Sequence, residues 1–304
     1  MNATTREILA GISQLATLAF AVSTMLAMGM GLTLRELLEP LRNVRFILAA
    51  LGINFIIVPA VAWLLAQVLG LAPDIRIGLL LIACAAGAPA VPKLVQIAKG
   101  DAATAVMLVT LLIVVTVVFA PLALPLLLPG VTVDSGAIAM SLAGQMLLPL
   151  GIGLLVRERW EEEATAYRPT VGTISNVALV VLLLTSVGTN IPGLLGLLGS
   201  GGILATVLLI AAAIVAGYLV GIPAGVERRV LALGAGQRNI AAAFIIGTGN
   251  FADRPEVLLS IGLAGLVMMV ILFPLAGEWS KRPSSLATPE EQEVAARATP
   301  GEVR

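Results

Sequence analysis

Residues 76–100 read RIGLLLIACAAGAPAVPKLVQIAKG, an apolar stretch of membrane-spanning length with Gly87, Pro89 and Pro92 in its middle. Proline has no backbone N–H, and its ring clashes with the preceding turn of a helix. Two prolines three residues apart, close to a glycine, therefore predict a helix that is unwound in its middle rather than merely bent.

A second apolar stretch, residues 228–250, reads RRVLALGAGQRNIAAAFIIGTGN. Gly234 and Gly236 precede the polar triplet 237–239 and predict a second unwound helix. Each break alone could be an ordinary kink, because glycine and proline are common in membrane helices. The two stretches are five predicted spans apart and so run in opposite directions. Matched interruptions in two halves of inverted topology point to a binding site at the membrane midplane.

The composition predicts an integral membrane protein. Of 304 residues, 59% are hydrophobic and 12% charged, whereas soluble domains have about 45–50% apolar and about 25% charged residues. The mean hydropathy is +1.03. There is no histidine and only one cysteine, so imidazole chemistry, internal disulfides and thiolate zinc sites are excluded. With no histidine and no acidic residue in the middle of an apolar stretch, the chain has almost no groups for catalysis, so we do not expect an enzyme. No cofactor is implied. The net charge of zero and the lack of a basic run argue against a nucleic-acid partner.

Stretches of about 20 apolar residues predict an all-α polytopic protein with nine transmembrane helices in residues 1–283. The polar stretch 284–304 is expected to be a disordered cytoplasmic tail. The predicted spans are about 8–33, 46–70, 76–98, 103–128, 136–156, 171–190, 203–222, 229–250 and 256–278, of which the third and eighth are broken.

Basic residues predict the orientation of these spans. Thirteen of the 18 Lys and Arg residues follow odd-numbered spans, whereas only Arg6, Arg76 and Arg254 lie on the other side. Because basic loops stay in the cytoplasm, the N-terminus is expected outside and the C-terminus in the cytoplasm. The expected location is a bacterial inner membrane.

The two remaining basic residues, Lys93 and Arg238, lie inside the broken spans. A cation inside the bilayer costs roughly 2.5–3.5 kcal/mol on insertion scales, and no acidic residue lies in the middle of a span. The two cations are therefore expected to receive an anionic substrate. The alternative for Lys93 is that its long side chain reaches an interface, because Lys99 in the next loop is close.

Three motifs carry a resemblance to a known family. MGMGLTL at 28–34, the interrupted stretch 84–110 and GAGQRNIAAAF at 234–244 resemble the bile acid:sodium symporter family. The resemblance implies two inverted five-helix repeats, here without the first helix. It also implies a core domain and a panel domain, with the two broken helices crossing in the core. Transport by alternating access follows from the same resemblance.

The chain departs from this family at the sodium positions. The resemblance implies side-chain oxygens at one sodium site, but the aligned residues are Val91, Pro92, Ala105 and Val109. At the second site the family glutamate is replaced by about Leu233. A hard cation takes six or more oxygen ligands, so we expect sodium binding to be weak and no other metal to bind.

Two amides remain as weak sodium candidates. Gln237 matches the family glutamine, and Asn54 stands where the family often has a longer amide. We hypothesise that Lys93 and Arg238 act as tethered cations in place of sodium, which predicts sodium-independent transport. The candidate substrate-binding residues are Lys93, Arg238, Asn239, Gln237, Pro89 and Asn54.

The sequence therefore predicts a secondary transporter of organic anions, with a small organic anion and the lipid bilayer as partners. One alternative is a sodium-coupled symporter of organic anions or bile acids, using Asn54, Gln237 and backbone oxygens. Another is a membrane sensor or receptor built on a transporter fold. Substrate identity, coupling, direction, stoichiometry and oligomeric state stay open.

Overall fold

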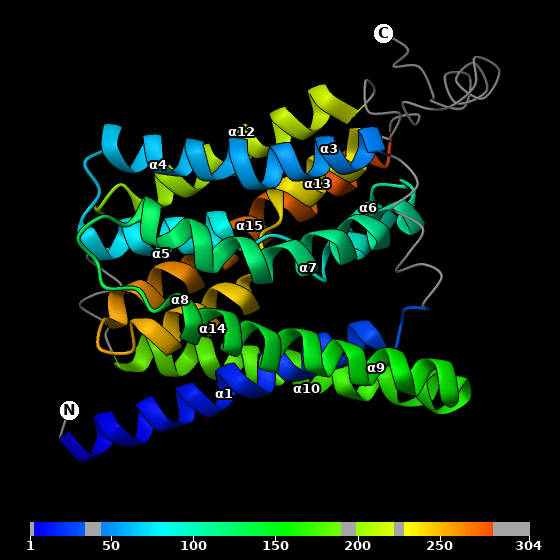
Figure 1. Ribbon diagram of the computed structural model, residues 1–304, viewed down its shortest axis with the longest axis horizontal. Helices are drawn as coiled ribbons and strands as arrows, with labels where there is room; N and C mark the ends of the chain where they lie inside the picture. The colour runs from blue at the N-terminus through cyan, green and yellow to red at the C-terminus, as the bar shows by residue number, and fades with distance from the viewer. Residues whose placement is uncertain (1–2, 34–43, 190–198, 222–227, 282–304) are drawn as a thin grey trace, which may run out of the picture.

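The computed structural model describes residues 3–33, 44–189, 199–221 and 228–281, and every regular element in these ranges is a helix (Figure 1). The α-helices are α1 (Ala3–Gly29), α3 (Val44–Gly52), α4 (Val58–Val68), α5 (Pro73–Cys84), α6 (Val91–Ile97), α7 (Ala102–Leu127), α8 (Ser135–Leu142), α9 (Leu148–Arg159), α10 (Glu161–Thr189), α12 (Gly202–Gly221), α13 (Arg228–Gly236), α14 (Ile240–Asn250) and α15 (Pro255–Trp279). Two π-helical turns, η2 (Ile53–Ile57) and η3 (Ala143–Leu147), join α3 to α4 and α8 to α9.

Length and apolar composition support the prediction of a polytopic membrane protein. Seven segments of the described chain are long and apolar enough to cross a bilayer. Of the other two predicted spans, one corresponds to α5 and α6, which are each short. The other corresponds to α10. The seven segments are Gly11–Gly29, Val44–Val68, Ala102–Leu127, Ser135–Arg159, Gly202–Gly221, Arg228–Asn250 and Pro255–Trp279.

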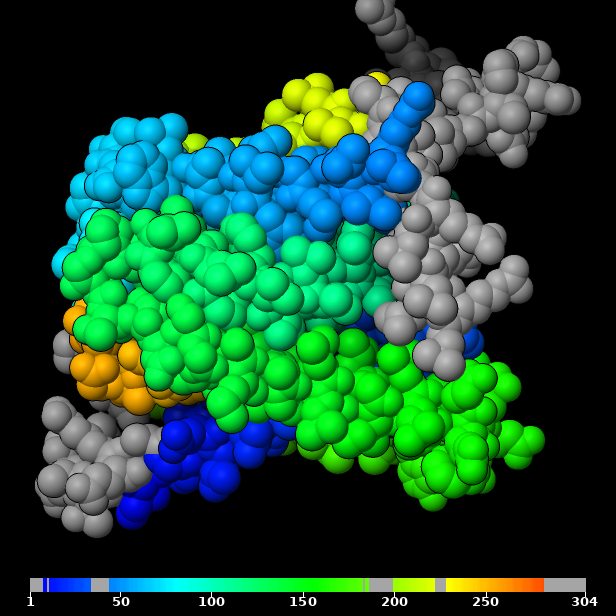
Figure 2. Space-filling view, viewed as in Figure 1, coloured from blue at the N-terminus to red at the C-terminus, as the bar shows by residue number. Residues whose placement is uncertain are grey.

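The outer surface of these helices is apolar, as a lipid-facing surface must be. Figure 2 shows a face formed by α3 and α4, α7, and α8 with α9. On α7, for example, Val118, Leu122 and Leu126 are 63%, 65% and 81% exposed. A soluble protein rarely leaves such a continuous apolar surface uncovered, so this face is expected to contact lipid.

The broken helices lie in the interior of the bundle. In Figure 1, α1, α9 and α10 lie along one side, and α3, α4 and α12 along the opposite side. Helices α1 and α9 approach closely because both have glycine at the contact: a Cβ on Gly29 would lie 2.2 Å from the carbonyl oxygen of Leu150. In segment 228–250, residues 229–239 and 241–247 are buried, so their polar groups must find partners within the protein.

One helix extends well beyond the membrane span predicted for it. Helix α10 begins at Glu161, ten residues before the predicted start of span 171–190. Glu161, Glu162 and Glu163 form its first turn, and acidic residues there stabilise the positive end of the helix dipole. The helix therefore continues beyond its apolar part. The predicted tail 284–304 lies outside the described residues, and the nine spans, inverted repeats and two domains stay predictions.

Candidate functional site

The first break is present where the prolines predict it. Helix α5 ends at Cys84 and α6 begins at Val91, with non-helical residues between them. Gly87 has a φ of +80°, and a Cβ there would lie 2.6 Å from the backbone nitrogen of Ile113. Only glycine fits this conformation and this space. Pro92 lies in the first turn of α6, where proline is tolerated because its missing N–H is not needed.

A threonine of α7 holds the backbone of the first break. The N–H of Ala86 donates to Oγ1 of Thr116 at 3.1 Å, and this hydroxyl lies 3.2 Å from the carbonyl oxygen of Ala86. Thr116 is fully buried. Because an unwound segment inside a protein must satisfy its backbone groups elsewhere, this side chain stabilises the break.

The second break contacts the first through Asn239. Its backbone N–H donates to the carbonyl oxygen of Ala85 at 2.9 Å, and its Nδ2 donates to the carbonyl oxygen of Gly87 at 2.9 Å. Its Oδ1 accepts from the N–H of Ala242 at 3.1 Å and so caps α14. The breaks therefore lie side by side. Both side-chain polar atoms of Asn239, a predicted substrate contact, have protein partners.

Arg238 lies beside this crossing with its guanidinium bonded to protein oxygens. Nη2 donates to the carbonyl oxygen of Ala83 at 2.6 Å, and Nε to that of Ile82 at 3.3 Å. Nη1 donates to Oδ1 of Asn54 at 2.5 Å and to the carbonyl oxygen of Ala235 at 3.4 Å. The last carbonyls of a helix carry partial negative charge. The ends of α5 and α13 therefore stabilise this cation, which is only 1% exposed.

Asn54 is oriented for this contact by its own helix. It lies in the π turn η2 and is fully buried. Its Nδ2 donates to the carbonyl oxygen of Ala50 at 3.0 Å, which leaves Oδ1 to accept from Arg238. π turns often occur at functional sites because they change the direction of a side chain. Both residues were candidates from the sequence, but their contact was not predicted.

Apolar packing occupies the region of the first predicted sodium site. Val91, Ala105 and Val109, which align with family positions that have side-chain oxygens, are fully buried. A Cβ on Gly234 would lie 2.3 Å from Cδ2 of Leu108 and 3.8 Å from Cγ1 of Val91. Within the described ranges, no group of three His, Cys, Asp or Glu residues could hold a metal ion.

Gln237 differs from its neighbours because its side-chain oxygen has no hydrogen-bond partner among the described residues. The residue is 8% exposed, and Oε1 is buried without a hydrogen bond. Leaving a buried acceptor unpaired costs about 1–3 kcal/mol. This oxygen is therefore available to a ligand that donates a hydrogen bond or carries positive charge.

Lys93 is separated from the buried guanidinium. Its side chain is exposed on α6, and Nζ donates to Oε1 of Gln96 at 3.3 Å. Pro89, half-buried, lies about one turn earlier. The two cations were expected to face one anion; in this structure Arg238 is buried and Lys93 is exposed. The reason is geometric: α6 is short, and the long side chain of a lysine in its first turn extends to the surface.

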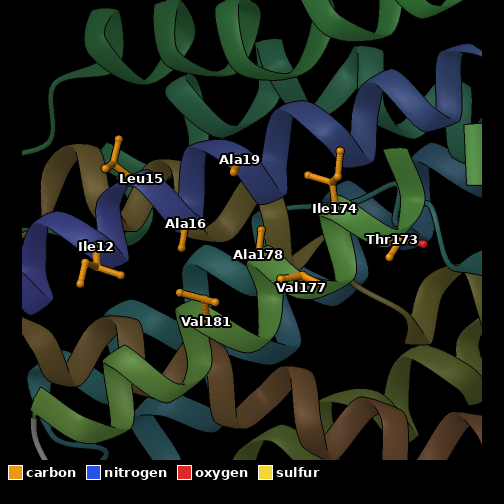
Figure 3. Close-up of a pocket in the computed structure, with 9 residues that line it drawn as sticks. All are labelled: Ile12, Leu15, Ala16, Ala19, Thr173, Ile174, Val177, Ala178 and Val181. Carbon is orange, nitrogen blue, oxygen red and sulfur yellow. The ribbon is translucent and has the colours of Figure 1, made fainter. Parts of the chain in front are cut away.

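A groove elsewhere on the molecule is apolar. It lies between α1 and α10, with a volume of about 450 Å³. Figure 3 shows Ile12 and Ala16 of α1 facing Ala178 and Val181 of α10. None of the predicted site residues lines it, and Thr173 is its only polar side chain. The lining residues are Ile12, Leu15, Ala16, Ala19, Thr173, Ile174, Val177, Ala178 and Val181.

Comparisons with known proteins agree with the geometry of a broken-helix transporter. The profile of the Sodium Bile acid symporter family matches residues 18–196, which is more than half of the chain. The match includes α5 and α6 and therefore the first break. Transporters, not enzymes, make up this family.

Several curated proteins are similar along most of this chain. The probable sodium/metabolite cotransporter BASS1, chloroplastic, of Arabidopsis thaliana is 26% identical over 85% of this chain and 65% of its own length. The corresponding rice BASS2 protein (Oryza sativa subsp. japonica) is 27% identical over 85% and 62%. The uncharacterized sodium-dependent transporter YocS of Bacillus subtilis is 26% identical over 84% and 80%. The chain thus spans just under two thirds of the two plant relatives.

Proposed function

We propose, because this chain belongs to the sodium bile acid symporter family, that it is a secondary transporter that carries organic anions across a membrane by alternating access. The contact between the two broken helices supports this proposal. Transporters of this architectural type bind substrate where two interrupted helices meet. The bilayer and a small organic anion are the partners that this function requires.

The position of Arg238 is the observation that carries the finer proposal of sodium independence. Its guanidinium contacts the carbonyl oxygens of Ile82, Ala83 and Ala235 and the amide oxygen of Asn54. Carbonyl and amide oxygens are also the ligands that a hard cation takes. Arginine keeps its charge, so a permanent cation replaces a bound ion at this crossing.

Lys93 is the residue that we propose for the anionic headgroup of the substrate. It is exposed about one turn after the first break, and within the described residues it has no ion pair. Gln96 accepts from Nζ and so orients the ammonium group without neutralising it. The rest of the substrate would lie between the helices that carry the breaks and the group α1, α9 and α10.

A sodium-coupled symporter is the second candidate function. Two of the relatives are named as probable sodium/metabolite cotransporters and a third as a sodium-dependent transporter. The specific observation in favour is Oε1 of Gln237, which is buried without a partner. An unpaired amide oxygen next to the second break is a suitable ligand for sodium.

Uptake into proteoliposomes tests both candidates. Labelled small carboxylates and an amphipathic steroid anion should be offered under inward gradients of sodium or choline at constant ionic strength. We expect uptake of at least one anion at the same rate in both salts. A saturable stimulation by sodium would overturn sodium independence and support the second candidate. Uptake of none of the anions would contradict organic-anion transport.

The headgroup role is tested by Lys93→Gln. We expect uptake to fall at least tenfold, because the substrate loses the exposed cation about one turn after the break. Lys281→Gln is a matched control, because Lys281 is also exposed but pairs with Glu278 at 2.8 Å at the end of α15. Unchanged uptake by a folded Lys93→Gln protein would exclude Lys93 from substrate binding.

A further inference from the structure

A cluster of aromatic and basic side chains lies where α12 and α15 end and α13 begins. Tyr218 is three residues before the end of α12, and Trp279 is the last residue of α15. Their ring centroids are 5.8 Å apart. The guanidinium carbon of Arg228, the first residue of α13, lies 4.9 Å from the centroid of the Tyr218 ring. This cation–π contact orients the arginine at the end of the bundle.

The helix lengths place this cluster at the depth of lipid headgroups. Helix α12 has 20 residues and α15 has 25, which at about 1.5 Å per residue matches or slightly exceeds a hydrocarbon core about 30 Å thick. Tyrosine and tryptophan favour the interface of a bilayer. We therefore expect Arg228 to lie at the level of the phosphates.

Further cations gather at the same end of the molecule. Nη1 of Arg229 donates to the carbonyl oxygen of Ala98 at 2.7 Å, which ties the end of α6, and with it the exposed Lys99, to the start of α13. Lys281 follows α15. The described carboxylates at these helix ends are Glu278, which pairs with Lys281, and Asp101, which caps α7. Positive charge therefore exceeds negative charge in the part described.

We propose that Tyr218, Arg228, Trp279, Lys281 and Lys99 form a binding site for the headgroup of an anionic phospholipid. A guanidinium binds phosphate oxygens through several parallel hydrogen bonds. Basic side chains at this depth also attract anionic lipids electrostatically.

An apolar surface continues from this headgroup cluster toward the middle of the membrane. Val215 and Leu219 of α12 are 55% and 66% exposed, and Phe273 of α15 is 38% exposed. An acyl chain attached to the bound headgroup would contact these residues. The site thus combines phosphate-binding cations with an apolar path, which favours a phospholipid over free phosphate.

Thermal unfolding in nanodiscs tests the proposal. The protein should be reconstituted in phosphatidylcholine alone or mixed with phosphatidylglycerol, and Tm measured. We expect phosphatidylglycerol to raise Tm and native mass spectrometry to detect retained phosphatidylglycerol. Equal Tm in both lipids, with no retained lipid, would overturn the proposal. An equal rise produced by inorganic phosphate in phosphatidylcholine would show a free-phosphate site and would also overturn it.

Variants locate the effect. Arg228→Gln should lose most of the rise in Tm caused by phosphatidylglycerol, and Tyr218→Leu should lose part of it, whereas Tyr218→Phe keeps the ring and the effect. The control is Arg157→Gln, because Arg157 pairs with Glu161 in another group of helices at 2.8 Å. If Arg228→Gln does not fold, the combination of exposed Lys99→Gln and Lys281→Gln makes the same test. A lipid effect that survives these changes would refute the site.

Discussion

Nη1 of Arg238 lies 2.5 Å from Oδ1 of Asn54, although 184 residues separate them in the chain. This contact connects the second broken helix to the π turn between α3 and α4. Both residues are almost fully buried, so water cannot take the place of either one as a hydrogen-bond partner. The free energy of each therefore depends on its partner, and removing one leaves a buried polar or charged group unpaired.

Asn54→Leu is expected to destabilise the protein, because leucine has similar size but cannot accept from the guanidinium. A hydrogen bond to a charged group contributes about 1.5–3 kcal/mol, and we expect a loss of about 2 kcal/mol in the free energy of unfolding. Thermal unfolding in detergent measures it. Asn176→Leu is the control, because Asn176 is exposed on α10. Equally small losses of stability in Asn54→Leu and Asn176→Leu would show that the contact between Asn54 and Arg238 does not stabilise the protein.

Removing the side chain of Arg238 should create a vacant cation site. In Arg238→Ala, the oxygens of Ala83, Ala235 and Asn54 lose their donor, and Tm should fall. Millimolar guanidinium chloride should partly restore Tm, because the free ion has the same planar donors. Sodium chloride at equal concentration should restore less.

The wild-type protein is the control for this rescue, because its site is filled and its Tm should not rise. If Arg238→Ala does not fold, Arg238→Lys serves instead. It keeps the charge but has three donors in a different geometry, so its Tm should lie below that of the wild type. If guanidinium does not raise the Tm of Arg238→Ala and Arg238→Lys has the Tm of the wild type, the side chain of Arg238 only fills space.

Thr116→Val tests how the first break is held. Valine has the shape of threonine but cannot exchange hydrogen bonds with Ala86, so we expect a loss of about 1–3 kcal/mol. Thr110→Val is a matched control in the same helix, because Thr110 is equally buried but donates only to the carbonyl oxygen of Val106 in its own helix. A similar Tm for both variants would show that Thr116 does not hold the break.

The sequence predicted the two breaks at the correct residues because their cause is local. Proline removes a backbone donor wherever it occurs, and glycine permits the φ of +80° observed at Gly87. The sequence also predicted a membrane protein, because this prediction follows from composition. Features that depend on a helix and its immediate neighbours in sequence can thus be derived without tertiary contacts.

The partners of Arg238 could not be derived in this way, and the exposure of Lys93 was predicted only as an alternative. Sequence analysis found no carboxylate for either cation and therefore assigned an anion to both. The carbonyl oxygens of Ile82 and Ala83 are present in any sequence, so no residue type signals that they will accept from a distant arginine. Which side of α6 reaches the surface likewise depends on how it packs against α7, α13 and α15.

Lys99→Gly is expected to stabilise the protein. Lys99 follows α6 with a φ of +55°, and a left-handed conformation costs roughly 1–2 kcal/mol for residues other than glycine. The N–H of Gly100 bonds the carbonyl oxygen of Val95 at 2.9 Å, the closing bond of a helix end that favours glycine at this position. Lys99→Ala removes the charge but keeps the strain, so its Tm should not rise. Equal Tm for both variants would assign the effect to charge.

Three glycine-to-alanine variants separate backbone strain from steric contact, the two effects that act together at Gly87 in the first break. Gly52 is helical with open space around its Cβ position, so Gly52→Ala should raise stability by about 0.5–1 kcal/mol. Gly70 has a φ of +57° but also has open space around its Cβ position. Gly70→Ala should therefore lower stability by about 1–2 kcal/mol through backbone strain alone. Gly87 combines a φ of +80° with a contact at 2.6 Å to backbone.

Gly87→Ala should therefore be the most damaging of the three, with a loss larger than that of Gly70→Ala. Because Nδ2 of Asn239 donates to the carbonyl oxygen of Gly87, a shift of this residue also disturbs the contact between the breaks. Uptake should fall more than Tm alone explains, when measured below the unfolding temperature. If Gly87→Ala matched Gly70→Ala in both Tm and uptake, the break would be able to relax away from Ile113, and the close approach would not be essential for the site.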